Sequence, residues 1–172
     1  MLFFGKKSEN KLIKKVKYNK EYDWKEGRAH LDLFDTDIDV LIHNGVDEQY
    51  AESCIEHINN LSPSLKNYLT ERLYKYYDFI RRECDDVEDI SFDDILKHLY
   101  PLNISIEKPE EPLIAYSIEC GCDWEEERGA EIIIKDNEIL FVGEFVGLGP
   151  WQIKNAMKLF FNLQKPQSTN NR

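Results

Sequence analysis

The sequence has no long hydrophobic run. None of its apolar stretches approaches the roughly 20 residues that a membrane-spanning helix needs. Residues 1–4 are apolar, but they are too few for the hydrophobic region of a secretory signal peptide or for stable attachment to a lipid surface. We therefore expect a cytoplasmic protein without stable membrane attachment.

Common catalytic motifs are missing as well. There is no phosphate-binding Gly-x-x-x-x-Gly-Lys loop, no Gly-x-Ser-x-Gly nucleophile motif and no His-Glu-x-x-His zinc motif. The glycine-rich segment 147–152 departs from the dinucleotide-binding fingerprint at its sixth position, where Gln152 stands. We therefore predict that the protein is not an enzyme and that it has no cofactor.

Cysteine occurs only four times, as Cys54, Cys84, Cys120 and Cys122. Because we expect no export, we interpret all four as reduced thiols. The alternative is a zinc site with four ligands, Cys54, His57, Cys120 and Cys122. The sequence leaves open whether these four residues converge. We favour buried core thiols and no metal, because cysteine is commonly buried and Cys-x-Cys is not the usual zinc spacing.

Positive charge is scarce outside the N-terminus. The chain has 22 Lys and Arg against 33 Asp and Glu, which gives a formal net charge of -11. Residues 1–20 carry seven Lys and one Glu, a net of +6, so -17 remains on the other 152 residues. Such an acidic body repels nucleic-acid phosphates, and we predict no nucleic-acid partner.

The composition otherwise fits one folded domain with ends of different character. Of 172 residues, 42% are hydrophobic and 21 are aromatic, which is enough to form a core in a chain of ordinary domain size. We expect a basic N-terminal arm or edge strand over residues 1–20, a single domain over 21–164 and a disordered tail over 165–172.

The first half of the domain changes from strand to helix periodicity. Partial alternation of apolar residues predicts strands at 31–34 and 38–42 with a turn at 35–37 between them. Apolar residues at spacings of three and four then predict helices at 47–60 and 63–84. We expect these two helices to form an antiparallel pair.

The second half returns to strands. It predicts a short helix at 91–98 and a final helix from Trp151 onward. Between them it predicts four strands, at 102–106, 113–122, 130–135 and 138–143. Asp136 and Asn137 form a two-residue hairpin loop, because both accept the left-handed backbone region. The predicted class is α+β, an antiparallel β-sheet with the antiparallel helix pair and shorter helices packed on one face.

A dense acidic stretch follows the second predicted helix. It contains Asp85, Asp86, Glu88 and Asp89. A calcium site is the alternative interpretation, but the stretch lacks the turn glycine and the final glutamate of a calcium-binding loop. We favour a solvated acidic loop, since blocks of like charge usually remain in water.

A tryptophan beside several carboxylates occupies the connection between two predicted apolar strands, with the sequence Asp123, Trp124, Glu125, Glu126, Glu127, Arg128 and Gly129. Two carboxylates near an indole could act as the acid and base of a hydrolase, as in glycoside hydrolysis. In the interpretation that we favour, Trp124 caps the core, Gly129 supplies an unusual backbone angle and the three glutamates face water.

Residues 124–143 resemble a sequence signature of a known domain family. They are similar to the C-terminal signature of an uncharacterised bacterial α+β domain family, whose members show Trp-acid-x-Glu-His-Gly before a β-hairpin and often occur near polymorphic toxins. The rest of the resemblance extends more loosely over residues 31–146. The resemblance implies a compact α+β domain with an immunity role and no known activity. The chain departs from the signature at Arg128, which neither binds metals nor titrates near neutral pH as histidine does.

These observations together predict a non-catalytic protein-binding domain. We expect the acidic body to attract a basic protein partner, as an immunity protein that neutralises a basic toxin would. The alternative is the hydrolase that uses a carboxylate pair near Trp124. The predicted contact residues are Asp85, Asp86, Glu88, Asp89, Trp124, Glu125, Glu126 and Glu127.

Overall fold

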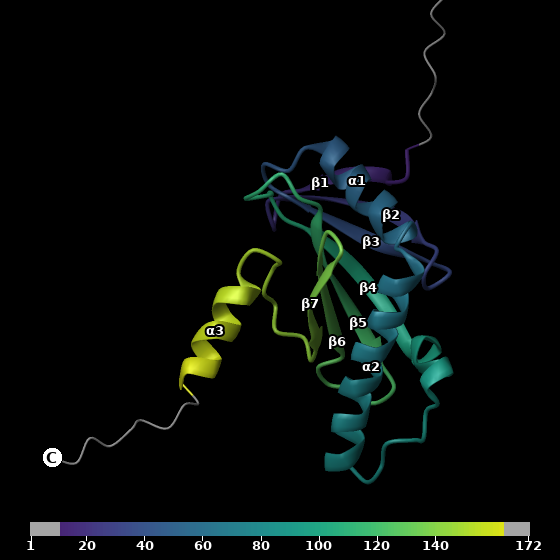
Figure 1. The fold of residues 1–172 in the computed structure, drawn as a ribbon. Coiled ribbons are helices and arrows are strands. Elements are labelled where there is room, and N and C mark those ends of the chain that lie inside the picture. The colour runs from purple at the N-terminus through teal and green to yellow at the C-terminus, as the bar shows by residue number, and fades with distance from the viewer. Residues whose placement is uncertain (1–10, 164–172) are drawn as a thin grey trace, which may run out of the picture.

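A seven-stranded β-sheet organises the chain in a computed structural model that describes residues 11–163, with side chains to residue 158 (Figure 1). The strands lie in the sheet in the order in which they occur along the chain. They are β1 (Lys14–Asn19), β2 (Trp24–Leu31), β3 (Thr36–His43), β4 (Leu99–Ile106), β5 (Ala115–Cys122), β6 (Ala130–Lys135) and β7 (Glu138–Gly143).

Every pair of neighbouring strands is antiparallel except β3 and β4, which are parallel. Parallel neighbours need a long crossover connection. Here the crossover contains α1 (Glu48–Asn59), α2 (Pro63–Glu83) and the short 3-10 helix η1 (Phe92–His98). The expected α+β class is therefore confirmed, with one parallel pair in a sheet that is otherwise antiparallel.

Local sequence signals set the starts of both long helices. The carboxylate of Asp47 accepts hydrogen bonds from the backbone N–H groups of Gln49 and Tyr50 and so caps α1. The hydroxyl of Ser62 caps α2 through the N–H of Leu65, and Pro63 follows at the first helical position.

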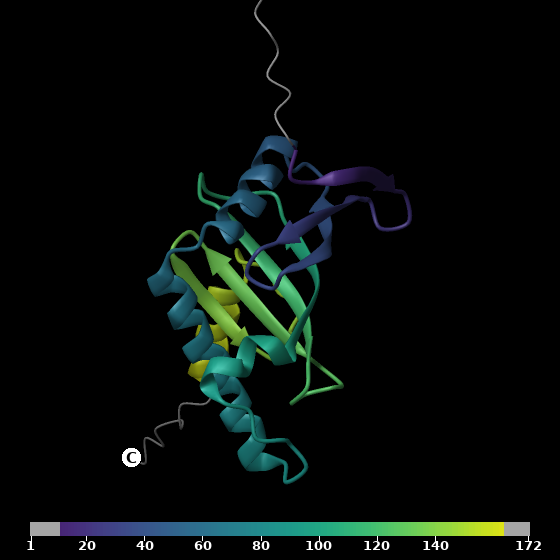
Figure 2. The ribbon, with the colours of Figure 1, turned by 90° about the vertical axis from the view of Figure 1, so that its right-hand side faces the viewer.

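The arrangement of these two helices differs from the expected antiparallel pair. Figures 1 and 2 show α1 and α2 following one another end to end along the same face of the sheet, instead of folding back on each other. The physical reason is that each helix already buries its apolar stripe against the sheet. Ile55 and Ile58 of α1 and Leu69 and Leu73 of α2 belong to one buried cluster with sheet residues such as Ile104.

The final helix also departs from the expected arrangement with all helices on one face. Figure 2 looks from the side of α2, and α3 (Ile153–Leu163) lies behind the sheet. Ile153 at the start of α3 is 2% exposed. Neither Ile153 nor Ile133 of β6 belongs to the buried cluster between the sheet and the helices α1 and α2. Because strand side chains alternate between faces, Ile133 points away from α1 and α2 and gives the second face apolar surface to cover.

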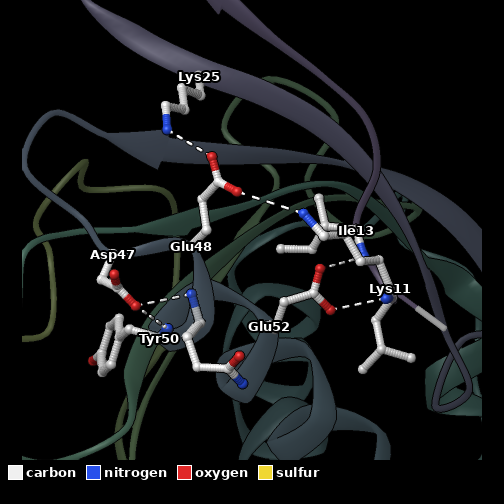
Figure 3. A network of polar contacts seen from close by, with 9 residues as sticks. Lys11, Ile13, Lys25, Asp47, Glu48, Tyr50 and Glu52 are labelled. Carbon is white, nitrogen blue, oxygen red and sulfur yellow. Dashed lines mark hydrogen bonds and ion pairs between the residues drawn. The ribbon is translucent and has the colours of Figure 1, made fainter. Parts of the chain in front are cut away.

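The N-terminal part of the described chain forms the edge strand β1 and is tied to α1 (Figure 3). The carboxylate of Glu52 accepts hydrogen bonds from the backbone N–H groups of Leu12 and Ile13, at 2.8 and 3.2 Å. Glu48 forms ion pairs with Lys25 at 2.8 Å and with Lys11 at 3.6 Å. The first part of the predicted arm, residues 1–10, and the predicted tail lie outside the described residues.

Candidate functional site

The structure brings the two predicted acidic segments to the same end of the molecule. Figures 1 and 2 show the loop that follows α2 and the connection between β5 and β6 in the lower part of the molecule. We call this region the acidic end. Its carboxylates are those of Asp85, Asp86, Glu88, Asp89, Glu125, Glu126 and Glu127.

Two adjacent tyrosines of α2 hold both segments in place. The hydroxyl of Tyr77 accepts a hydrogen bond from the N–H of Ile90 at 2.8 Å and donates one to the carbonyl of Glu88 at 3.0 Å. The hydroxyl of Tyr76 donates to the carbonyl of Gly129 at 2.9 Å. Tyr76 and Tyr77, at consecutive positions on α2, therefore attach both acidic segments to the same helix.

Trp124 lies beneath this surface and not on it. Its ring packs edge-on against those of Tyr76 and Tyr77, with centroid distances of 6.1 and 6.0 Å, and the residue is 3% exposed. The expectation that Trp124 contacts a partner directly does not fit this position. Burial of a large aromatic side chain stabilises the core. The interpretation of Trp124 as a cap on the core matches the geometry.

The carboxylates of the acidic end differ in what they contact. Asp89 forms an ion pair with Arg81 at 2.5 Å, and Glu125 accepts hydrogen bonds from the N–H groups of Glu127 and Arg128 within its own turn. The remaining carboxylates are exposed and form no ion pair with the described residues. These are Asp85, Asp86, Glu88, Glu126 and Glu127.

The carboxylates nearest to Trp124 are engaged in local contacts. Asp123 accepts hydrogen bonds from the hydroxyl of Tyr100 at 2.7 Å and lies 2.7 Å from Nδ1 of His98. The Tyr100 hydrogen bond is the main reason that the pKa of Asp123 lies below its usual value, with His98 contributing in the same direction. Asp123 and the Glu125–Glu127 group line neither of the two clefts described next. This geometry disfavours a carboxylate pair acting on a substrate beside Trp124.

The face of the sheet opposite to α1 and α2 contains a cleft that the sequence did not predict. Its volume is about 290 Å3, and we call it the carboxylate cleft. Strands β2 to β6 and the segment after β7 supply its lining. The lining residues are Trp24, Leu41, His43, Asn103, Ser105, Glu107, Ser117, Glu119, Glu131, Phe145, Gly147, Leu148 and Gly149.

Glu131 is the most buried carboxylate of this cleft, at 2% exposure. Its Oε2 atom accepts hydrogen bonds from the N–H groups of Val146 and Gly147, at 3.0 and 3.2 Å. Burial raises the pKa of Glu131 most, and the neighbouring charges of Glu119 and Glu107 raise it further, against the lowering effect of the two hydrogen bonds. The three carboxylates therefore share one electrostatic environment.

A second and larger cleft, of about 540 Å3, lies between the β1–β2 edge and the end of α1. Some of its charges are paired within the protein, whereas Lys14 and Lys15 form no ion pair with the described residues. Arg28 pairs with Asp39 at 3.0 Å, and His30 lies 3.0 Å from Asp37. The charged lining residues of both signs are Lys11, Lys14, Lys15, Arg28, His30, Asp32, Asp37 and Glu56.

The buried thiols make local contacts. Cys54 lies 3.8 Å from the carbonyl of Ala115, and Cys122 lies 3.6 Å from that of Glu125. Burial raises the pKa of both thiols to about 12, which opposes the thiolate form that metals bind. Nδ1 of His57 lies 2.8 Å from the Tyr116 hydroxyl. Across residues 11–163, no three His, Cys, Asp or Glu side chains are grouped so that they could hold a metal ion.

Comparison with known proteins assigns the chain to a family. The model of the family described as a domain of unknown function (DUF6985) matches residues 12–149, so the chain belongs to this family. The match extends from the residues before β1 to Gly149, which lines the carboxylate cleft. No curated protein and no solved structure matches the chain. Within the described part of the chain, no helix has the length and apolar character needed to cross a membrane.

Proposed function

We propose that this member of the DUF6985 family is a non-catalytic, cytoplasmic protein-binding domain whose acidic end contacts a basic protein. The observation that carries the proposal is the placement of two acidic segments, separate in sequence, on one end of the molecule. Five of their carboxylates remain exposed there without an ion pair among the described residues.

Long-range attraction supports this function. A concentration of one sign of charge increases the rate of encounter with an oppositely charged partner, and the effect weakens as salt is added. Holding the two segments in place also limits the conformational entropy that ordering them on binding would cost. The tyrosine contacts of α2 meet that requirement, because they fix the backbone at Glu88, Ile90 and Gly129.

The partner that we propose is a cationic toxin, which would make the protein an immunity protein. Two observations support this choice. The acidic end offers the charge that such a toxin would otherwise meet on its nucleic-acid target. The signature around Trp124 to Gly129 is also similar to that of domains near polymorphic toxins. In this mechanism the acidic end blocks the toxin by occupying its cationic surface.

The test compares two variants that each lose three negative charges. The first variant carries Asp86→Asn, Glu126→Gln and Glu127→Gln at the acidic end. These side chains form no hydrogen bond or ion pair with the described residues, so the fold should tolerate their replacement. The measurement is the association rate with the purified product of a neighbouring toxin gene, at low and high salt.

The matched control carries Glu21→Gln, Glu56→Gln and Glu110→Gln, three exposed carboxylates away from the acidic end whose side chains also lack such contacts. We expect the acidic-end variant to associate about tenfold more slowly at low salt than the control, with a smaller difference at high salt. Equal rates for the two variants would overturn the proposed surface. Failure of the unmodified protein to bind any neighbouring cationic toxin would overturn the immunity role.

A further inference from the structure

Three carboxylates from three positions in the sheet converge on the carboxylate cleft. Glu119 lies in the middle of β5, Glu131 lies on β6, and Glu107 directly follows β4. Glu119 and Glu131 lie directly opposite each other in the β5–β6 register, and Glu107 lines the same cleft. The three side chains share the sheet face that α1 and α2 do not cover, because side chains at alternate strand positions share a face.

No cation of the described chain balances these charges. Glu107, Glu119 and Glu131 form no ion pair with any described residue, and the cleft lining contains no Lys or Arg. Glu119 accepts one hydrogen bond, from the side-chain amide of Asn103 at 2.8 Å. Both hydrogen bonds to Glu131 end on Oε2, which leaves Oε1 without one from the described residues although the residue is 98% buried. The Oε1 atom can therefore accept a hydrogen bond from a group that enters the cleft, either water or a bound cation.

The remaining walls suit a group that is both charged and organic. The indole of Trp24 stacks on Tyr22 with a centroid distance of 4.9 Å, and its N–H donates to Glu26 at 2.8 Å, so its plane is held in place. The ring of Phe145 lies on another wall. Aromatic faces attract organic cations, and the attraction grows when water is excluded.

The segment after β7 shapes the cleft around these carboxylates. Gly149 lies against the carboxylate of Glu107 so closely that a Cβ atom at this position would overlap it. The N–H groups of Val146 and Gly147 bind Glu131 from the same segment. This segment therefore contacts two of the carboxylates, and it forms one wall of the cleft of about 290 Å3.

We propose that the carboxylate cleft binds the ammonium or guanidinium group of a small organic cation, with Glu119 and Glu131 as its acceptors. A cleft of about 290 Å3 is at the small end of ligand sites, which suits one such group with a short aliphatic chain. A bare metal ion fits less well, because the described residues form no group of three ligands suited to one. The site lies on a different surface from the acidic end, so this proposal goes beyond the protein-binding function and does not depend on it.

The experiment titrates the full chain with butylammonium and butylguanidinium chloride by isothermal calorimetry, with sodium butyrate as the anionic control. We expect saturable binding of one equivalent of at least one cation and none of butyrate. Absence of saturable binding of either cation up to about 10 mM would overturn the proposal. An arginine residue with blocked ends serves as a third titrant. Tighter binding of this compound than of the free cations would support a protein side chain as the source of the cation, and weaker binding a free small molecule.

Glu119→Gln tests the assigned acceptor, because glutamine keeps the shape of the side chain and an oxygen for Asn103 but removes the charge. We expect about tenfold weaker cation binding, since hydrogen bonds to charged groups are stronger than neutral ones. Glu107→Gln provides a second variant should Glu119→Gln not fold, as judged by circular dichroism. The matched control is Glu110→Gln, an exposed carboxylate outside the cleft, which should bind as the unmodified protein does. Equal weakening in Glu119→Gln and Glu110→Gln would mean unspecific charge attraction and would overturn the site.

Discussion

The acidic end and the carboxylate cleft both concentrate negative charge, but the protein handles that charge in opposite ways. At the acidic end the carboxylates stand in water around a buried aromatic centre formed by Trp124, Tyr76 and Tyr77. In the cleft they point inward, and Glu131 is almost fully buried.

This difference separates two kinds of recognition. Exposed charges act over a Debye length and favour fast encounter, while each single contact contributes little. A buried carboxylate acts only at contact distance, but leaving it without a partner costs considerable free energy. The acidic end is therefore suited to attraction of a large partner, and the cleft to selection of one small group. Three predictions test this contrast, from the largest expected effect to the smallest.

Trp124→Ala should remove the support of the acidic end. We expect the free energy of unfolding to fall by about 3–5 kcal/mol, as for other truncations of large buried aromatic residues. The loss arises because the rings of Tyr76 and Tyr77 lose their packing partner. Urea denaturation followed by circular dichroism measures it. Trp124→Phe should lose less, and a loss below about 1 kcal/mol in Trp124→Ala would contradict the assigned core role.

Gly129→Ala and Gly149→Ala compare the backbone of the two regions. Gly129 has a φ of +60°, and an added Cβ would overlap the backbone carbonyl of Cys120, which has little room to move. We expect its substitution to lower the free energy of unfolding by about 1–3 kcal/mol. At Gly149 the added atom would meet only the end of the Glu107 side chain, so the loss should be smaller. Thermal melts of both variants provide the measurement, and equal losses would contradict the comparison.

The pH dependence of stability should reveal the buried carboxyl of the cleft. Burial raises the folded-state pKa of Glu131 above its ordinary value of 4.5, so the folded protein binds this proton more tightly than the unfolded chain does. The resulting stability is fully present below the unfolded-state pKa and is lost as pH rises through the folded-state pKa. Relative to Glu131→Gln, the unmodified protein should therefore become more stable as pH falls from about 7 toward 4.5, by less than either loss above.

Urea denaturation of both proteins across this range gives the difference directly. The comparison with Glu131→Gln is needed because His57 titrates with the opposite sign. Burial lowers the pKa of His57, so its contribution to stability is lost as pH falls below its ordinary value of 6.5. Both proteins contain His57, and its effect cancels in the difference. A difference that stays constant or reverses with falling pH would contradict the assigned burial of Glu131.

Local signals in the sequence predicted several elements well. The hairpin at Asp136 and Asn137 lies where expected, between β6 ending at Lys135 and β7 beginning at Glu138. The capped starts of α1 and α2 were also predictable, because each depends on residues within one helical turn. The hairpin formed by β2 and β3 is displaced from the predicted position, which had strands at 31–34 and 38–42. Its turn includes Asp32 to Asp35, and β2 begins at Trp24 in a charged stretch that gave little alternation.

The candidate sites were predictable only in part. The acidic residues of the acidic end were identified from their density, but their proximity depends on α2 bringing Tyr76 and Tyr77 between two distant segments. The sequence did predict the two strands, at 102–106 and 113–122. It gave no sign that β4 and β5 pair in the register that joins Asn103 to Glu119.

The amino-acid sequence by itself determined most of the helices and strands, the acidic character of the domain and the lack of common catalytic motifs. Periodicity, capping and charge are properties of neighbouring residues, so they can be read without the tertiary structure. Only the tertiary structure decided that α1 and α2 share a sheet face while α3 takes the other, and that three glutamates line one cleft. Those outcomes depend on strand pairing and packing between residues far apart in the chain, which no local pattern encodes.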